Sequence, residues 1–245
     1  MKINHNYYLK LAFENAKVSL GKTKTNPSVG CVVVKDDSVI SSGRTSSSGR
    51  PHAEANALKI KKNFKNADLY TTMEPCTHYG LTPPCTNLII KKGIKRVFFS
   101  FYDIDSRTAR LSKKKLNIKN VKVYKINQGE FNSFYQSYFI NKKNCEPLID
   151  AKIAVSKDYY TINKKSKWIT NSLSRKRVHL IRSNYDAIIS TSKSINLDNS
   201  QLNCRLNGYD INTPDLFIID LNLKIKKNLK LFKQLNKRKI FLITS

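Results

Sequence analysis

Apolar and polar positions along the first half of the chain predict a sheet covered by helices. Residues 3–20 have apolar side chains at helical spacing, which predicts an amphipathic helix that ends at Gly21. Runs of β-branched and aromatic residues predict strands at 29–35, 39–42, 68–72, 96–101 and 121–126, with Asp36-Asp37 as a hairpin turn. Further helices are expected from His52 to about Lys61, from the N-cap Thr82 to about Lys92, and from Gly129 to about Asn141, where an aromatic stripe predicts core packing. Helices that alternate with strands in this order predict a mixed α/β sheet.

A polar junction at residues 141–146 separates this pattern from a second one. We therefore predict two domains, 1–145 and 146–245. Strands are expected at 148–155, 186–191, 215–221 and 239–244, and helices at 172–182, capped by Thr170 or Ser172, and at 225–235. This alternation is typical of nucleotide-binding α/β domains, although the chain has no Gly-x-Gly-x-x-Gly motif.

Composition narrows the functional classes. The 245 residues are 40% hydrophobic, which is enough to build a core, and no apolar run is long enough to span a membrane. The N-terminus lacks the features of a signal peptide, and five cysteines argue against a disulfide framework, so we expect a cytoplasmic protein. The net charge of +28 comes from lysines spread over every expected element. We interpret this charge as a compositional bias and expect no nucleic-acid partner.

One imidazole and two thiols have the spacing of a catalytic zinc site. His52, Cys76 and Cys85 offer three ligands, which leaves the fourth zinc position for water. Glu54, two residues after the histidine, can move the protons of that water. This His-x-Glu and Pro-Cys layout is that of zinc nucleobase deaminases. Two alternatives stay open: a closed structural zinc site with His78 as fourth ligand, and cysteines that merely pack in a core.

The motifs around these residues resemble one family. Cys76 and Cys85 are nine residues apart, and the segments 26–32, 51–58 and 72–76 are similar to the deaminase domain of the bifunctional riboflavin biosynthesis RibD family. The resemblance implies a cytidine-deaminase-like three-layer α/β/α domain with Zn²⁺ and Glu54 as the catalytic proton shuttle. It implies a phosphorylated diaminopyrimidine substrate, held by Asn26 and His78. For these two residues, a role in stabilising their loops is the alternative. The segment 102–106 departs from the family's Asp-Pro-Asn-Pro run.

The second half resembles the RibD reductase domain, which implies a dihydrofolate-reductase-like α/β fold and NADPH. Positions that match cofactor contacts of the family are Ala154, Trp168, Ser194 and Asp198. Positions that match substrate contacts are Ser166, Arg182, Leu202 and Arg205. Core packing is the alternative for Trp168, and an exposed basic residue is the alternative for Arg182.

The reductase half also departs from its family. Asp158-Tyr159-Tyr160 replaces the family's Asp-Gly-Arg, and Gly208 is the only glycine after residue 146. Backbone cradles for phosphate rely on glycine. We therefore expect a partial, C-terminally truncated reductase domain with weak or absent NADPH binding.

The leading hypothesis is a zinc-dependent pyrimidine deaminase of riboflavin biosynthesis, acting on a small molecule as a homo-oligomer and with no membrane partner. The alternative is a zinc deaminase that acts on a base in RNA or DNA. A non-catalytic binding module stabilised by zinc is the third hypothesis.

Overall fold

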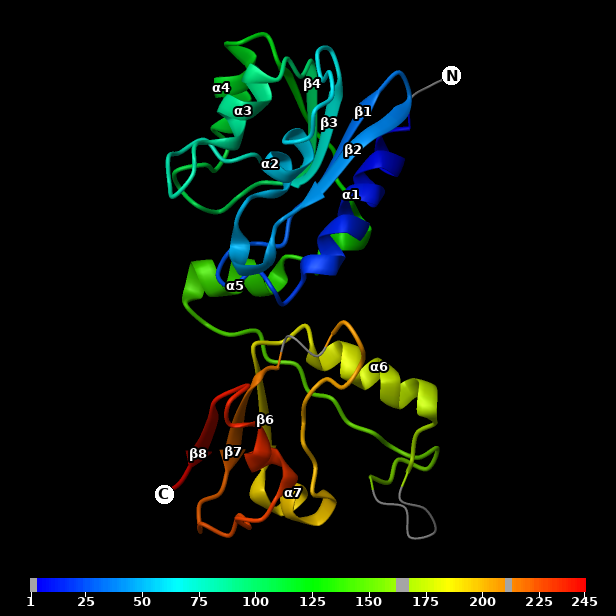
Figure 1. The fold of residues 1–245 in the computed structure, drawn as a ribbon, viewed down its shortest axis with the longest axis vertical. Helices are drawn as coiled ribbons and strands as arrows, with labels where there is room; N and C mark the ends of the chain where they lie inside the picture. Colours follow the sequence, from blue (N-terminus) through cyan, green and yellow to red (C-terminus); the bar gives the residue numbers. More distant parts are fainter. Residues whose placement is uncertain (1–3, 162–167, 210–212) are drawn as a thin grey trace. The chain divides into compact units, whose positions relative to one another are not determined.

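The computed structural model describes residues 4–161, 168–209 and 213–245, and the chain divides into two compact units (Figure 1). Unit 1 comprises Met1–Ile149 and unit 2 comprises Asp150–Ser245. The boundary predicted at residues 145–146 lies close to this division. No helix among the described residues has both the length and the apolar character needed to cross a membrane.

Unit 1 is built on a five-stranded mixed sheet, with strand order β2-β1-β3-β4-β5. Its strands are β1 (Gly30–Lys35), β2 (Ser38–Arg44), β3 (Asp68–Met73), β4 (Arg96–Phe101) and β5 (Lys122–Lys125). β1 is antiparallel to β2 and β3, whereas β3, β4 and β5 are parallel to one another. The predicted strands of this half are therefore confirmed to within a few residues. Asp36 and Asp37 both have positive φ (49° and 56°), as a tight two-residue hairpin turn requires.

Helices cover both faces of this sheet. They are α1 (His5–Ser19), α2 (Ala53–Leu58), α3 (Cys85–Lys91), α4 (Ser112–Asn117) and α5 (Gln136–Asn144), with short 3₁₀ turns at Ser47–Gly49 and Gly129–Phe131. Leu9 and Ala12 of α1 are buried on one face, against Val32, Tyr70 and Phe98. α2 and α3 lie on the other face, which makes a three-layer α/β/α unit (Figure 1).

A glycine lets the helix that carries the candidate site lie directly on the sheet. A Cβ at Gly43 of β2 would lie 2.4 Å from both the carbonyl oxygen of Ala53 and the amide nitrogen of Ala57 in α2. Any larger residue at this position would therefore push α2 away from β2. Because α2 follows His52 and contains Glu54, this contact sets the depth of both residues.

Unit 2 contains a three-stranded parallel sheet of order β6-β7-β8. Its elements are α6 (Ser172–Arg182), β6 (Ala187–Thr191), α7 (Ser192–Asp198), β7 (Asp215–Ile219), the 3₁₀ turn Lys230–Gln234 and β8 (Ile240–Ile243). Ile195 of α7 and Leu216 and Ile218 of β7 form the buried core with Leu229 and Leu231. The predicted strands at 186–191, 215–221 and 239–244 are confirmed.

Several predicted elements are wrong. The predicted strand at 148–155 is not a strand, and its Ile149 and Ile153 are 75% and 69% exposed, so its alternating pattern has no face to bury. The helix predicted at 225–235 is only a 3₁₀ turn, because Asp220 accepts hydrogen bonds from the backbone at 224 and 225 and shapes a loop there.

Helix starts are also corrected. α6 is capped by Asn171, whose side chain accepts from Ser174 N–H, and α3 begins at Cys85, so Thr82 is not a cap. The helix predicted at 129–141 is interrupted, since α5 starts at Gln136, but its aromatic stripe does pack on the core, as predicted. The sequence analysis predicted neither α4 nor α7.

Candidate active site

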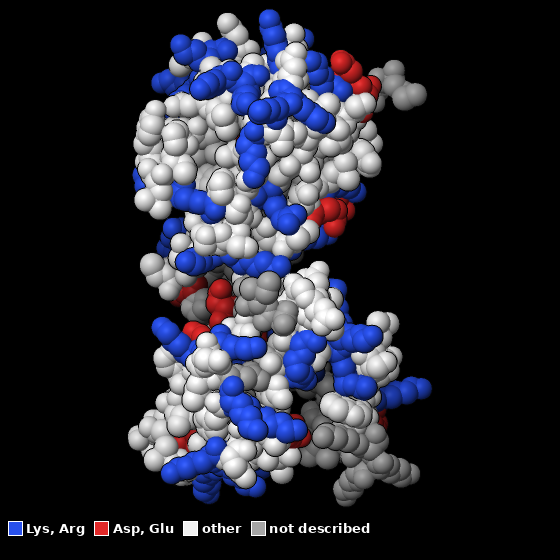
Figure 2. All heavy atoms as spheres, in the orientation of Figure 1, with Lys and Arg blue, Asp and Glu red and all other residues white. Residues whose placement is uncertain are grey.

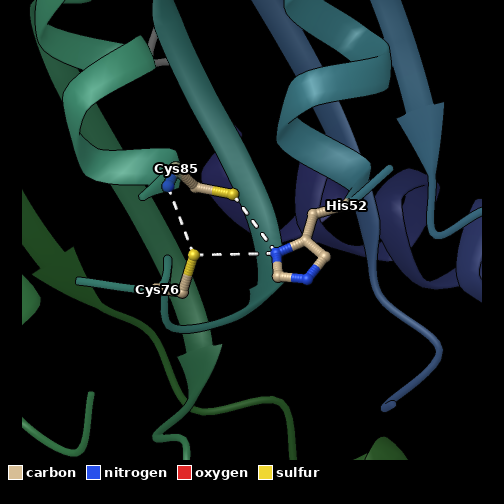
Figure 3. A group of neighbouring side chains, drawn as sticks. All are labelled: His52, Cys76 and Cys85. Atoms are coloured by element: carbon tan, nitrogen blue, oxygen red, sulfur yellow. Dashed lines mark hydrogen bonds between the residues drawn. The ribbon is translucent and has the colours of Figure 1, made fainter. Parts of the chain in front are cut away.

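His52, Cys76 and Cys85 converge at the ends of three elements of unit 1. His52 immediately precedes α2, Cys76 lies three residues beyond β3, and Cys85 is the first residue of α3. Nδ1 of His52 lies 3.6 Å from Sγ of Cys76 and 3.4 Å from Sγ of Cys85, and all three ligand atoms lie within 4.8 Å of one another (Figure 3). The imidazole and both thiols therefore face one common point.

The geometry of the three groups fits zinc. With Zn–S near 2.3 Å, Zn–N near 2.0–2.1 Å and tetrahedral angles, sulfur and nitrogen ligands of one zinc lie about 3.6 Å apart. The two observed nitrogen–sulfur distances, 3.4 Å and 3.6 Å, agree with this value. Among the described residues, these three form the one group of potential metal ligands, and His78 is not part of it. The arrangement therefore matches an open three-ligand site better than a closed four-ligand one.

Local hydrogen bonds prepare Cys76 to act as a thiolate. The Cys85 thiol, the His52 ring and the Cys85 backbone N–H, which lies 3.2 Å from the sulfur, all donate to it and lower the pKa of Cys76 to about 4. The same contact raises the pKa of Cys85 well above its usual value, because Cys85 is the donor of the pair and is buried. The hydrogen bond with Cys76 also raises the pKa of His52.

Glu54 lies beside this triad in the first turn of α2, and its side chain is only 3% exposed. Burial raises the pKa of Glu54 to about 7, against the opposing effects of the His52 ring and of a hydrogen bond with Cys85. A carboxyl group with a pKa near neutrality can both accept and return a proton at cellular pH. Its position and ionisation therefore suit a proton shuttle.

Asn26 lies against the loop that leads to His52. Its side-chain nitrogen would be 2.2 Å from a Cβ on Gly49, whose φ is +92°, so only glycine allows the two loops to come this close. Thr45 ties the same segments together, since its hydroxyl donates to Pro27 O (3.2 Å) and accepts from Val29 N–H (2.9 Å). The sequence motif around Asn26 and the motif around His52 are thus joined in space.

His78 lies two residues after Cys76 and is half-buried. Its Nδ1 lies 3.0 Å from the hydroxyl of Thr108, which is fully buried. The hydrogen bond fixes the orientation of the ring, and this leaves Nε2 for a ligand.

Two residues that the sequence analysis had given no role hold the site together. Glu74, between β3 and Cys76, is 4% exposed and accepts from Arg110 N–H (2.9 Å), Ser112 N–H (3.1 Å) and Ser112 Oγ (2.7 Å). Arg50 donates from Nη1 to Oγ1 of Thr82 at 2.8 Å, which links the loop before His52 to the loop between the cysteines. Glu74 belongs to the Met-Glu-Pro-Cys motif, so the sequence did contain a signal for it.

In unit 2, the structure brings together Arg182, Leu202 and Arg205, three of the predicted substrate positions. Nη1 of Arg182 donates to Asn203 O (3.3 Å), and Nη1 of Arg205 donates to Asn203 Oδ1 (2.6 Å). Burial and the nearby charge of Arg205 lower the pKa of Arg182. Leu202 precedes Asn203 and packs on the core of the unit. Two guanidinium groups thus gather around one turn.

The predicted cofactor positions lie on three stretches of the chain. Ser194 is in the first turn of α7, where its N–H donates to Thr191 Oγ1 (3.3 Å), and Asp198 is the last residue of this helix. Ala154 is half-buried, and Trp168 is 56% exposed with the Arg175 guanidinium 4.5 Å from its ring centre. Ser166 lies outside the described residues.

Comparisons with known proteins agree with this division. Residues 2–101 match the family model of the cytidine and deoxycytidylate deaminase zinc-binding region, and residues 147–245 match that of the RibD C-terminal domain. The chain is 34% identical over 227 residues to the riboflavin biosynthesis protein RibD of Aquifex aeolicus, and 32% identical over 215 residues to that of Escherichia coli.

A solved structure decides the family. The deaminase/reductase of Thermotoga maritima matches 98% of this chain and 69% of its own length, with 31% identity and a TM-score of 0.87. The chain belongs to the RibD family. Acinetobacter baumannii RibD is also similar, with 30% identity over 98% of the chain and a TM-score of 0.83. The predicted fold class, a cytidine-deaminase-like domain followed by a RibD reductase-like domain, is confirmed. The chain spans 64% of the length of the Aquifex aeolicus RibD and 59% of that of Escherichia coli.

Proposed function

We propose that unit 1 is a zinc-dependent pyrimidine deaminase of riboflavin biosynthesis. Its substrate would be 2,5-diamino-6-(5-phosphoribosylamino)pyrimidin-4(3H)-one, and its products 5-amino-6-(5-phosphoribosylamino)uracil and ammonia. The observation that carries the proposal is the convergence of His52, Cys76 and Cys85 beside the buried Glu54. Membership of the RibD family supports the choice of substrate.

Each residue of the site has a defined task. His52, Cys76 and Cys85 would hold zinc, and zinc bound in an open site supplies an activated water at neutral pH. Glu54 takes a proton from the attacking water and delivers protons to the ring nitrogen and to the leaving amino group. Because its pKa is raised to about 7, the carboxyl can perform both transfers. Asn26 would hold the pyrimidine, and His78 would line the same substrate pocket.

Ammonia release from the diaminopyrimidine phosphate tests the proposal directly. Protein loaded with one zinc per chain should release ammonia, and Glu54→Gln should lower kcat by at least about 100-fold, as expected for loss of general acid–base catalysis. Zinc content is measured in parallel and should be unchanged in this variant. Exposed Glu14, whose one ion pair among the described residues is with Lys17, provides the control Glu14→Gln. Wild-type activity in Glu54→Gln would refute the proposal.

A base in RNA or DNA is less well supported as the substrate. Lysines and arginines are scattered over both units on the face shown in Figure 2 and do not form one continuous band. Tracking a nucleic-acid backbone calls for a basic stripe or patch on one surface. Base conversion in tRNA, with binding that weakens steeply as salt rises, would favour this alternative.

For unit 2, we propose that Arg182 and Arg205 hold a phosphorylated ligand, because arginine contacts phosphate through two parallel hydrogen bonds. The family resemblance also supports a homo-oligomer. Light scattering, which gives the molar mass in solution, tests whether the protein is a homo-oligomer. Titration with ribose 5-phosphate tests the phosphate site, and Arg205→Ala should bind this ligand more weakly than wild type.

A further inference from the structure

Arg50 places a guanidinium group over the loop between the two cysteines. Its Nη1 donates to Oγ1 of Thr82 at 2.8 Å, and its Nη2 lies 3.3 Å from the point that a Cβ on Gly80 would occupy. The side chain is half-buried, and Arg50 precedes His52 by only two residues. The cation therefore lies over the turn at Gly80, and its charge acts on the His52 ring.

A second nitrogen reaches the same place. Nε2 of His78 lies 3.9 Å from the same point at Gly80. The other ring nitrogen, Nδ1, is engaged by the hydroxyl of buried Thr108. When this hydroxyl donates to Nδ1, the proton of the neutral ring is on Nε2, which can then donate. Two N–H groups within 4 Å of one point can bind the same phosphate, because each N–H···O bond spans about 2.7–3.2 Å.

The charge of Arg50 is not neutralised within the protein as described. No carboxylate in the described part of the chain lies within 4.0 Å of its guanidinium. Asp105, whose charge acts on His78, is itself paired with Arg107 at 2.5 Å. Among the described residues, the guanidinium of Arg50 donates one hydrogen bond, to Thr82, which leaves its other N–H groups for an anion.

We propose that Arg50, together with His78, binds the phosphate of the deaminase substrate and sets the preference for phosphorylated over dephosphorylated compounds. Arginine suits this task because its planar guanidinium binds phosphate through parallel, charge-assisted hydrogen bonds. The inference rests on the proposed deaminase function. It assigns phosphate recognition in unit 1 to a residue outside the zinc-binding and proton-transfer group.

The test compares kcat/KM for the phosphorylated substrate with kcat/KM for its dephosphorylated riboside. Arg50→Ala should lower the first value about 10- to 100-fold and leave the second within about threefold, so that most of the preference is lost. Arg50→Lys keeps a charge but not the planar fork, and should show an intermediate preference. Equal preference in wild type and Arg50→Ala would overturn the proposal.

A matched variant separates recognition from loop stabilisation. Thr82→Val removes the acceptor for Nη1 but leaves the cation, so it should keep the preference for phosphate. If Arg50 acted only by holding the loop, Arg50→Ala and Thr82→Val would lower kcat/KM by the same factor for the phosphorylated substrate and for the riboside. That result would show that the proposal is wrong. Zinc content is measured for every variant to detect damage to the metal site.

A binding measurement distinguishes failure of this inference from failure of the proposed function. Ribose 5-phosphate is added to the full chain while the NMR signals of the His78 ring are followed, assigned by comparison with His78→Gln. The signals should shift in wild type and Thr82→Val and should not shift in Arg50→Ala. A shift without turnover of either substrate supports the phosphate site and rejects the proposed reaction. The same shift in wild type and Arg50→Ala rejects the role of Arg50.

Discussion

The strongest test of how the site is supported concerns Glu74. Its buried carboxylate accepts three hydrogen bonds, from Arg110 N–H and from the N–H and Oγ of Ser112. Each hydrogen bond to a charged group contributes about 1.5–3 kcal/mol, and the three are not additive. Glu74→Gln keeps one oxygen, which can still accept from Ser112, but turns an amide NH₂ toward Arg110 N–H. We therefore expect unit 1 to lose about 2–4 kcal/mol of unfolding free energy.

The assay is urea denaturation followed by far-UV circular dichroism, together with hydrogen exchange of the peptide that contains residues 108–118. Exchange should accelerate there, because the amide of Arg110 loses its acceptor and the amide of Ser112 keeps only an uncharged one. Glu14→Gln is the matched control. Its exposed ion pair with Lys17 predicts a change below about 1 kcal/mol. If Glu74→Gln were as stable as Glu14→Gln, with unchanged exchange, the buried carboxylate would not have the supporting role given to it here.

Three further predictions follow from the described contacts. Tyr135→Phe should cost about 1–3 kcal/mol in urea denaturation, because the hydroxyl donates to Ser28 O (3.0 Å) and pairs with Thr72 Oγ1 (2.6 Å) in the core. Zinc affinity, measured by chelator competition, should rise about tenfold per pH unit between pH 6.5 and 8, because the raised pKa of Cys85 means that binding must displace at least one proton; a pH-independent affinity would contradict this. NADPH titration followed through Trp168, the only tryptophan, should show weak or absent binding; micromolar affinity would show that the argument from scarce glycine is wrong.

The convergence of His52, Cys76 and Cys85 was easier to predict than its surroundings. These residue types can bind zinc, and with Glu54 two residues after His52 their spacing favours a zinc deaminase. The strands of unit 1 were also predictable, because each is buried and rich in β-branched or aromatic residues.

The elements that the sequence analysis predicted wrongly depend on residues far away in the sequence. A strand at 148–155 would need a neighbouring strand, and the structure as described offers none. Thr82 has the residue type of an N-cap, but its hydroxyl accepts from Arg50, which lies 32 positions earlier in the chain. Secondary-structure propensity depends on a residue and its near neighbours in the sequence, so it does not predict contacts between residues that are far apart in the chain.

The helices that carry the site are too short to be stable alone. α2 has six residues and α3 has seven, whereas isolated helices shorter than about 12–15 residues are marginal in water. Neither helix has a side-chain N-cap hydrogen bond. The positions of the candidate metal ligands must therefore come from tertiary contacts, among them the glycine approach at Gly43 and the carboxylate of Glu74. It follows that substitutions at Gly43 or Glu74 should disturb zinc geometry without touching a ligand.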